Sequence, residues 1–168
     1  MKEKLEIKGN VVVVLENAHT GKKRVFKAKN LVTDAGDLHY AEHGAHASPT
    51  NVFGIFELAT GHTAVPAKGQ NRSNITGYVT GSQKAMTATY PKVNDVDSDN
   101  TGAGVDIVTY LVSYLTSEAN NGAITEVIIT NVTPGASEPI LTHADLTSFA
   151  KTSSDTLKVF VNHTLTGI

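Results

Sequence analysis

Residues 11–28 read VVVVLENAHTGKKRVFKA, two β-rich runs on either side of a polar loop that contains Gly21. Valine at four successive positions favours a strand, because β-branched side chains pack well on a pleated surface and lose rotamer freedom in a helix. Asparagine and glycine are typical of the turn between two strands. The stretch therefore predicts a β-hairpin formed by residues 11–15 and 22–28.

The composition of the whole chain agrees with this hairpin. The chain has 168 residues and a mass of 17.8 kDa, which is the size of one domain. It contains 21 Thr, 18 Val, 14 Gly and 12 Asn, and its charged fraction of 18% is below the ~25% of an ordinary globular protein. Because Thr and Val favour strands whereas Gly and Asn favour turns, the composition argues against a helical bundle.

One segment has the sequence features of a helix. In residues 30–43, NLVTDAGDLHYAEH, Thr33 or Asp34 is suited to cap a helix N-terminus, and Asp37 places negative charge in the first turn. A glycine and then a proline follow the segment, as is typical of a helix end. We predict one short helix, at about residues 33–45.

Short β-like runs follow this helix, separated by loops rich in Gly, Asn, Asp, Ser and Pro. We therefore predict a mainly β fold, a jelly-roll-like antiparallel sandwich in a single domain of residues 1–168. The run 105–115, VDIVTYLVSYL, is apolar at odd and even positions alike, so we expect it to be covered on both faces, in mid-sheet or at a subunit contact. The predicted strands are residues 52–59, 75–90, 105–116, 124–132, 140–147 and 156–166.

Basic residues are concentrated in an N-terminal segment, residues 1–29. It holds eight of the fourteen Lys and Arg residues and three of the sixteen acids, giving 8 − 3 = +5, so the remainder carries 6 − 13 = −7. Two interpretations stay open: an edge strand whose lysines discourage aggregation, or a contact with an acidic partner surface. One aromatic and one Arg are too few for a nucleic-acid stacking platform, so we expect no direct nucleic-acid partner. We predict Lys22, Lys23 and Arg24 as the partner contact.

The sequence HYAEH at residues 39–43 fits the H-x-x-E-H pattern of one class of zinc peptidases. Spacings of four and three place His39, His43 and His46 on one helix face, close enough to share a metal ion. A peptidase of this class also needs a ligand from a second helix, whereas this sequence predicts one helix. A metal hydrolase built on His39, Glu42 and His43 is therefore the weakest function that we consider, and an ordinary polar helix face is the alternative.

A second pattern suits calcium. Asp95, Asp97, Asp99 and Asp106 occupy positions 1, 3, 5 and 12 of a calcium-loop register, from which alternate carboxylates converge on one oxygen-lined centre. Position 6 is Asn100 where glycine is usual, and the flanks are predicted strands. These four residues are weak metal candidates, and a solvated acidic loop is the alternative.

Other functional classes find no support in the sequence. It has no cysteine, no G-x-S-x-G nucleophile elbow, no P-loop and no dinucleotide fingerprint. No apolar run reaches the ~18 residues of a membrane span, and the first ten residues lack the apolar stretch of a signal peptide. We therefore predict a protein that is not an enzyme, with no cofactor and no membrane partner.

Four segments, in chain order, resemble motifs of a broad group of tailed-bacteriophage virion proteins. Residues 30–36, NLVTDAG, resemble the N-L-V-T-x-A-G motif that opens a helix, and residues 59–66, ATGHTAVP, are similar to a G-T-G-x-T-x-x-P turn. Residues 121–127, NGAITEV, resemble a G-x-I-T-E-[AV] strand. Residues 148–165, SFAKTSSDTLKVFVNHTL, resemble the ending S-x-x-K-T-x-S-D-T-L-x-V-x-W-x-L. The match spans about residues 10–166.

The resemblance implies an all-β, jelly-roll-like subunit of a phage particle, often trimeric, with capsid decoration (cement) as its role. Its implied partners are the major capsid protein and further copies of the chain, and its implied location is the outer capsid surface of the virion. Some members of the group are tail or baseplate proteins, so the alternative is a tail-fibre or baseplate-associated subunit that binds a host surface through loops 66–74 or 94–104. The chain departs from the pattern at Val161 or His163, where an aromatic is common, and in the acidic loop 95–102.

Overall fold

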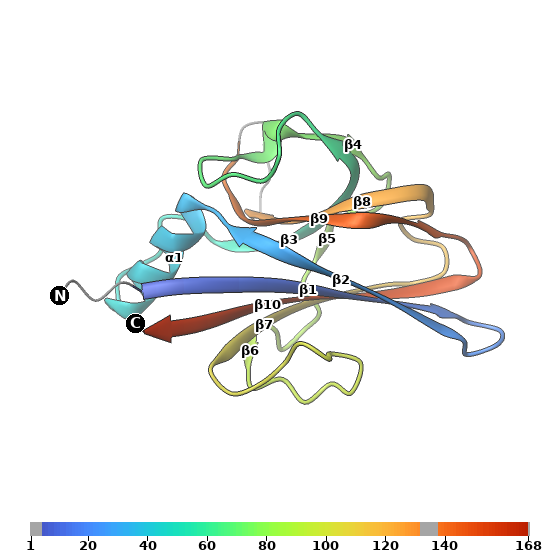
Figure 1. The fold of residues 1–168 in the computed structure, drawn as a ribbon, viewed down its shortest axis with the longest axis horizontal. Helices are drawn as coiled ribbons and strands as arrows, with labels where there is room; N and C mark the ends of the chain where they lie inside the picture. The colour runs from blue at the N-terminus through green and yellow to red at the C-terminus, as the bar shows by residue number, and fades with distance from the viewer. Residues whose placement is uncertain (1–4, 132–137, 168) are drawn as a thin grey trace.

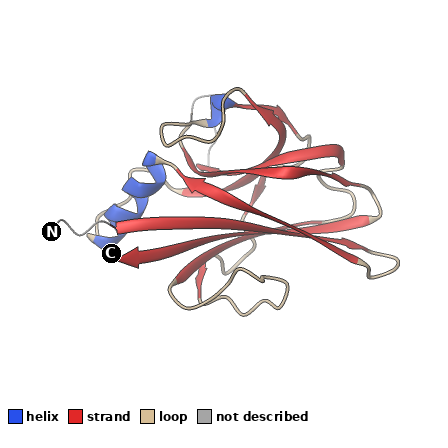
Figure 2. Cartoon of the chain, viewed as in Figure 1, coloured by secondary structure: helices blue, strands red, loops and turns tan. Residues whose placement is uncertain are grey.

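An open antiparallel sheet of ten strands makes up most of the chain in this computed structural model, which describes residues 5–131 and 138–167 (Figure 1, Figure 2). The helix α1 spans Asp34–Gly44, and a short 3-10 helix, η1, spans Arg72–Asn74. The strands are β1 (Leu5–Asn17), β2 (Lys23–Val32), β3 (Phe53–His62), β4 (Ile75–Tyr78), β5 (Lys84–Ala85), β6 (Lys92–Val93), β7 (Ile107–Tyr114), β8 (Asn121–Asn131), β9 (Ile140–Lys151) and β10 (Asp155–Gly167).

The sheet folds over on itself to make two layers. Its strand order is β4-β3-β8-β9-β2-β1-β10-β7-β6, with β5 paired to β3. The two halves join where β9 pairs with β2, at residues 30–32 only, and the sheet does not close into a barrel. Figure 1 shows β3, β8 and β9 in one layer and β1, β10 and β7 in the other. The prediction of a mainly β antiparallel sandwich with one short helix is confirmed.

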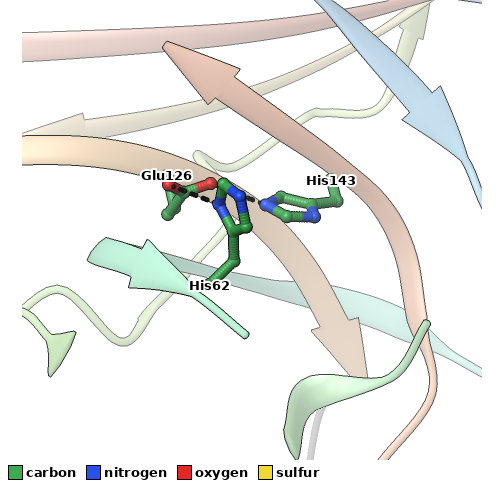
Figure 3. A group of neighbouring side chains, drawn as sticks. All are labelled: His62, Glu126 and His143. Atoms are coloured by element: carbon green, nitrogen blue, oxygen red, sulfur yellow. Dashed lines mark hydrogen bonds and ion pairs between the residues drawn. The ribbon is translucent and has the colours of Figure 1, made fainter. Parts of the chain in front are cut away.

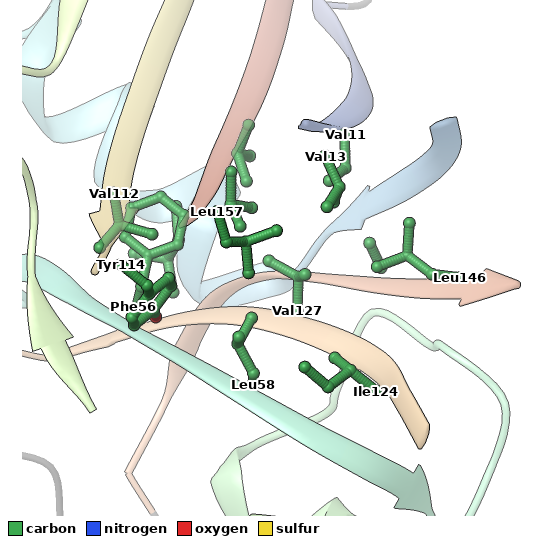
Figure 4. Close-up of a cluster of buried hydrophobic side chains, with 14 of the residues drawn as sticks. Val11, Val13, Phe56, Leu58, Val112, Tyr114, Ile124, Val127, Leu146 and Leu157 are labelled. Atoms are coloured by element: carbon green, nitrogen blue, oxygen red, sulfur yellow. The ribbon is translucent and has the colours of Figure 1, made fainter. Parts of the chain in front are cut away.

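The main core lies between the two layers (Figure 4). The inner face of β1 contributes alternate residues to it, as the period of two along a strand requires. The same alternation holds on β10 and β7, and the core gains volume from aromatic side chains on β3 and β7. Its fully buried members include Val11, Val13, Phe56, Leu58, Val112, Tyr114, Val127, Leu157 and Val159.

Both outer faces of the sandwich also carry apolar clusters: Ala59, Ile75, Ile128 and Ile140 form one, against which Tyr78 packs. Val12, Val14, Leu111 and Phe160 form the other cluster, over which Tyr90 packs. The doubly apolar run in β7 thus has its inner residues in the core and Leu111 in this outer cluster. The run does not lie in mid-sheet, because β7 is bordered by β10 and by the two-residue β6. The two ends of the run are not covered within the chain, because Val105 is 77% exposed and Leu115 is 62% exposed.

The hairpin and the helix form as the sequence predicts. β1 and β2 pair in antiparallel register through residues 9–16 and 23–30. Helix α1 begins after Thr33, whose Oγ1 accepts a hydrogen bond from Gly36 N at 3.1 Å, so Thr33 and not Asp34 is the N-cap.

One predicted strand is wrong. Residues 75–90 form the short strands β4 and β5 joined by turns, because beyond β4 the backbone adopts positive φ at Gly81 (75°) and Thr89 (76°) and so leaves the extended conformation. The predicted strand 124–132 is observed as β8, except that Val132 lies outside the described residues. No helix within residues 5–131 and 138–167 has the length and apolar character that crossing a bilayer requires.

Candidate functional site

Two histidines and a glutamate from three neighbouring strands converge on the outer face of the sandwich (Figure 3). His62 comes from the end of β3, Glu126 from β8 and His143 from β9. Glu126 Oε1 lies 3.1 Å from His62 Nδ1, and Glu126 Oε2 lies 2.7 Å from His143 Nε2. Within the described part of the chain, this is the one group of three or more His, Asp or Glu side chains whose ligand atoms all lie within 4.8 Å of one another.

A β-bulge brings His143 to this face. In the β8–β9 ladder Thr130 pairs with Ile140, but Ile129 pairs with Thr142, so Leu141 is an extra residue on β9. The extra residue reverses the alternation of the side chains that follow it. His143 therefore lies opposite Ile128 and on the same outer face as Glu126, while Leu141 stays in the core.

The contact with Gln70 places a proton on Nδ1 of the His143 ring. The Gln70 Nε2 group donates to the carbonyl oxygens of Ala64 and Val65, at 3.0 Å each, so its Oε1 atom is the one that faces His143 Nδ1, at 2.8 Å. Because an amide oxygen only accepts, Nδ1 of His143 must carry a proton. The hydrogen-bond network thus leaves Nε2 as the nitrogen that faces Glu126.

The Glu126 carboxylate is almost wholly buried but well supplied with partners. Its side chain is 2% exposed, that of His143 is 0% exposed and that of His62 is 21% exposed. Burial alone raises the pKa of the Glu126 carboxyl, but hydrogen bonds from His143, Thr125 and His62 outweigh it, so this pKa lies below its usual value. The 2.7 Å contact between Glu126 Oε2 and His143 Nε2 therefore holds one proton between two buried groups.

The loop of residues 63–74, called here the 63–74 loop, covers this face and is held by a second buried carboxylate. Arg72 Nε and a terminal nitrogen of its guanidinium donate to the two oxygens of Glu57, at 2.7 and 2.8 Å, in the bidentate geometry that favours such pairs. The guanidinium also lies 4.4 Å from the centre of the Tyr78 ring. The loop is therefore fixed over the His62–Glu126–His143 group, with the edge of His62 open to solvent.

A different buried histidine closes one end of the core. His163 Nδ1 lies 2.7 Å from the Tyr40 hydroxyl, and its Nε2 lies 3.0 Å from Asn30 Nδ2. The Tyr40 hydroxyl in turn lies 3.1 Å from the Tyr110 hydroxyl. Burial, with a smaller contribution from His39, lowers the pKa of His163 to about 3, so this imidazole is neutral.

The histidines predicted from the HYAEH pattern do not form a three-ligand group. The rings of His39 and His43 are close, with centroids 4.4 Å apart, but His39 Nδ1 is engaged with the Asn51 carbonyl at 3.2 Å. Glu42 turns to Thr50, which donates to it from both backbone and side chain. His46 lies beyond the helix end with a φ of 54°, where the helical spacing no longer applies.

The candidate calcium ligands Asp95, Asp97 and Asp99 are occupied by other side chains of the same chain. Asp97 and Asp99 both pair with Lys158 Nζ, at 2.9 and 3.0 Å, and hydrogen bonds from Lys23 and Lys158 hold the pKa of Asp99 below its usual value. Asp95 instead accepts from the Tyr90 hydroxyl at 2.8 Å and from an Asn100 amide at 3.1 Å.

Asp106, the fourth candidate, has a φ of 60° and an exposed side chain, and its backbone carbonyl accepts from Leu165 N at 3.3 Å. The four carboxylates therefore do not share a centre. The solvated-loop interpretation is also incomplete, because the loop is anchored to the outer face of β10 through Lys158 and through Asn100, whose Nδ2 lies 2.8 Å from Asn162 Oδ1.

The predicted partner contact lies at the exposed tip of the first hairpin. Lys22, Lys23 and Arg24 are all exposed. Lys23 Nζ pairs with Asp99 at 2.7 Å and with Glu16 at 3.6 Å, so part of its charge is balanced within the chain.

Comparison of the chain with protein-family models, with curated proteins and with solved structures finds no match. The site must therefore be interpreted from its own geometry. Sequence reasoning missed His62, Glu126 and His143 because 64 and 17 residues separate them and no local spacing links them. The one available signal was that Glu126 and His62 both fall inside segments that resemble virion-protein motifs.

Proposed function

We propose that the chain is a structural subunit of a tailed-bacteriophage virion, a capsid decoration (cement) protein that binds the outer capsid surface and stabilises contacts between major capsid subunits. The main support for this proposal is that residues of the resembling motifs form connections between elements of the sandwich. A set of motifs that specifies architecture is what a structural protein requires.

The first motif, residues 30–36, forms the joint between β2 and α1. Thr33 caps the helix, and its backbone N–H donates to the Leu141 carbonyl at 3.1 Å, which ties the helix start to β9. Gly36 packs so closely on β9 that an added Cβ atom would lie 2.4 Å from the Leu141 carbonyl oxygen. The local geometry therefore requires both the threonine and the glycine of the motif.

The last motif, residues 148–165, includes the turn between β9 and β10. Lys151 is 1% exposed, and its Nζ donates to the Leu115 carbonyl at 2.9 Å. Asp155 Oδ2 accepts from the backbone and the hydroxyl of Thr152, at 2.9 and 2.7 Å, and closes the turn. The lysine, threonine and aspartate of the motif thus each have a structural partner, which supports the resemblance.

A row of lysines along β2 is the surface that best suits an acidic capsid. Lys23, Lys27 and Lys29 are exposed, and Lys27 and Lys29 alternate with the half-buried Phe26 and Ala28. β2 pairs with β9 only at residues 30–32. The part of β2 that bears these lysines therefore pairs with β1 on one side and forms a sheet edge on the other. Charge complementarity at such an edge steers association and weakens as salt rises.

Binding of this kind stabilises a capsid by linkage. A protein that binds only the assembled shell stabilises it by RT ln(1 + [L]/Kd), which reaches ~4 kcal/mol per site at a thousandfold excess over Kd. Many equivalent sites act together on one shell. No chemical step is required of the subunit.

A trimeric state is part of this proposal and rests on the resemblance alone, because the chain's own Tyr90 loop covers the outer face of β7. The alternative role in a tail fibre or baseplate relies on loops 66–74 and 94–104 as host-binding surfaces. Arg72 and Lys158 tie these two loops to the sandwich, so decoration is the role that we carry forward.

The first prediction tests attachment with a triple variant, Lys22→Gln, Lys23→Gln and Arg24→Gln. Surface changes of this kind alter the stability of the fold by about 0.5 kcal/mol or less per site. We expect wild-type protein to decorate undecorated capsids of the encoding phage at low salt, with fewer bound copies at high salt. The triple variant should bind fewer copies than wild type at low salt, as counted by quantitative electrophoresis of sedimented capsids.

A second triple variant, Lys68→Gln, Lys84→Gln and Lys92→Gln, removes the same charge elsewhere and should decorate as wild type does. Equal binding of all three proteins at both salt concentrations would exclude electrostatic attachment through the hairpin. Absence of wild-type protein from capsids, or its location on the tail in electron micrographs of intact particles, would contradict the decoration role itself.

A further inference from the structure

We propose that His62, Glu126 and His143 bind one Zn²⁺ ion. Two imidazole nitrogens and a carboxylate oxygen are a ligand set that zinc takes in proteins. Their ligand atoms lie within 4.8 Å of one another, and they come from the adjacent strands β3, β8 and β9 of a rigid sheet. The inference goes beyond the proposed function and does not depend on it.

The environment of His143 is that of a metal ligand. A histidine that binds a metal through one ring nitrogen usually donates the N–H of the other to an oxygen, which fixes the ring and its tautomer. His143 Nδ1 makes this contact with Gln70 Oε1 at 2.8 Å. The Gln70 amide is itself fixed by the carbonyls of Ala64 and Val65, so the outer support of the ligand is complete.

The observed distances suit an ion of this size. Zn–N and Zn–O distances of about 2.0–2.1 Å separate the ligand atoms of a tetrahedral site by about 3.3 Å. The 3.1 Å contact joins His62 to Glu126 Oε1 and the 2.7 Å contact joins His143 to Glu126 Oε2, so one of these oxygens serves as the ligand. Separations of up to 4.8 Å among the three ligand atoms then need shorten by about 1.5 Å or less to reach that value. Small rotations of the His62 and Glu126 side chains provide such a change.

Zinc binding at this site exchanges a proton for a metal ion. The proton that lies between His143 Nε2 and Glu126 Oε2 must leave before the nitrogen lone pair can bind Zn²⁺. The proton passes to solvent, and the Zn–N bond takes the place of the N–H bond. The ion enters on the side of His62, the one partly exposed ligand, and a water molecule from that side completes the coordination.

The bound ion would join β3, β8 and β9 to the 63–74 loop. In the described chain this loop is already held at Glu57 through Arg72 and at His143 through Gln70, and the metal would fix the position of His143 itself. A ligand that binds only the folded state stabilises it in proportion to the logarithm of its concentration. The ion therefore acts on the stability of the sandwich.

The test uses the full chain, treated with chelator and then titrated with Zn²⁺ in a calorimeter. We expect one ion per chain, with proton release detected as a dependence of the binding heat on buffer ionisation enthalpy. At a hundredfold excess over Kd, Zn²⁺ should raise the melting temperature by roughly 5 to 10 °C. Co²⁺ in place of Zn²⁺ should give the visible absorption spectrum of a tetrahedral site.

His62→Gln is the decisive variant, because His62 is the partly exposed ligand and its loss leaves the pair of Glu126 and His143 intact. Its melting temperature without metal should stay near that of wild type, while the zinc-dependent increase is lost. His43→Gln is the matched control, since it removes a histidine from the rival pair on α1 and should keep full binding.

Glu126→Gln provides an independent second variant and should also abolish binding. Three results would each overturn the assignment: no zinc-dependent heat in the wild type, unchanged stoichiometry in His62→Gln, or loss of binding in His43→Gln. None of these results bears on capsid binding, so the two proposals stand or fall separately.

Discussion

His143 and His163 are both fully buried histidines on long strands, yet their hydrogen-bond partners differ in kind. His143 lies on an outer face, with the Glu126 carboxylate at one ring nitrogen and the Gln70 amide oxygen at the other. His163 lies at the end of the inner core against a tyrosine hydroxyl and an asparagine amide, and it is neutral. Equal burial therefore does not make two imidazoles equivalent. Their hydrogen-bond partners decide whether the side chain is suited to a metal.

The largest expected effect separates these two environments. His143→Leu leaves the buried Glu126 carboxylate with His62 and Thr125 but without its closest partner, and removal of one member of a buried ion pair costs about 3 kcal/mol or more. The free energy of unfolding of chelator-treated protein, measured in urea, should fall by this amount.

The double variant Glu126→Leu and His143→Leu is the control for charge. It removes both charges together, so it should be more stable than His143→Leu alone. A double variant that is less stable than the single variant would mean that packing, and not an unpaired carboxylate, accounts for the loss.

The second prediction concerns pH and His163. Its folded-state pKa of about 3 lies below the ordinary value of 6.5, so the unfolded chain takes up a proton on this side chain as pH falls below 6.5, while the folded chain does not. Stability from this group is complete above pH 6.5 and is lost progressively as pH falls toward 3. The slope of ~1.4 kcal/mol per pH unit amounts to about 2 kcal/mol between pH 6.5 and 5.

Urea unfolding across this pH range measures the effect, and His163→Gln should remove about one proton from its slope. His39 shifts in the same direction, because burial and then the charge of His43 lower its pKa, so His39→Gln is the companion variant. The titratable groups that face His163 are Tyr40, Tyr110 and His39; burial raises the pKa of both tyrosines, so neither ionises in this range. An unchanged slope in His163→Gln would contradict a neutral buried imidazole.

The elements that the sequence predicts well are those determined by neighbours along the chain. The β1–β2 hairpin follows from valine-rich alternation around a glycine turn, and α1 follows from the Thr33 cap with acids in its first turn. These signals act within about ten residues. The predicted strand 75–90 was wrong for a local reason too, since positive φ at Gly81 and Thr89 interrupts it.

The candidate site could not be predicted because it depends on register. Glu126 pairs with Ala59 of β3, three residues before His62, and His143 reaches this face only because Leu141 is an extra residue in β9. A bulge is a property of two strands and leaves no fixed pattern in one. For the same reason the acidic loop looked like a calcium site, since its partner Lys158 lies about sixty residues away in the chain.

The smallest expected effect concerns Asp97, a partly exposed carboxylate, in contrast to the buried Glu126. Asp97 pairs with Lys158 at 2.9 Å, but their side chains are 22% and 38% exposed, so solvent screens the pair. Exposed pairs contribute about 0.2–1 kcal/mol, and Asp97→Ala should therefore cost less than about 1 kcal/mol in urea unfolding. Lys158 keeps Asp99 as a partner at 3.0 Å, which limits the loss further.

The response of the melting temperature to chelator should be the same in Asp97→Ala and in wild type, because the four aspartates of the acidic loop do not share one centre. His62→Gln should remove that response. If Asp97→Ala instead abolished the response to chelator, the metal would reside in the acidic loop, and the contrast between buried and exposed carboxylates would be reversed.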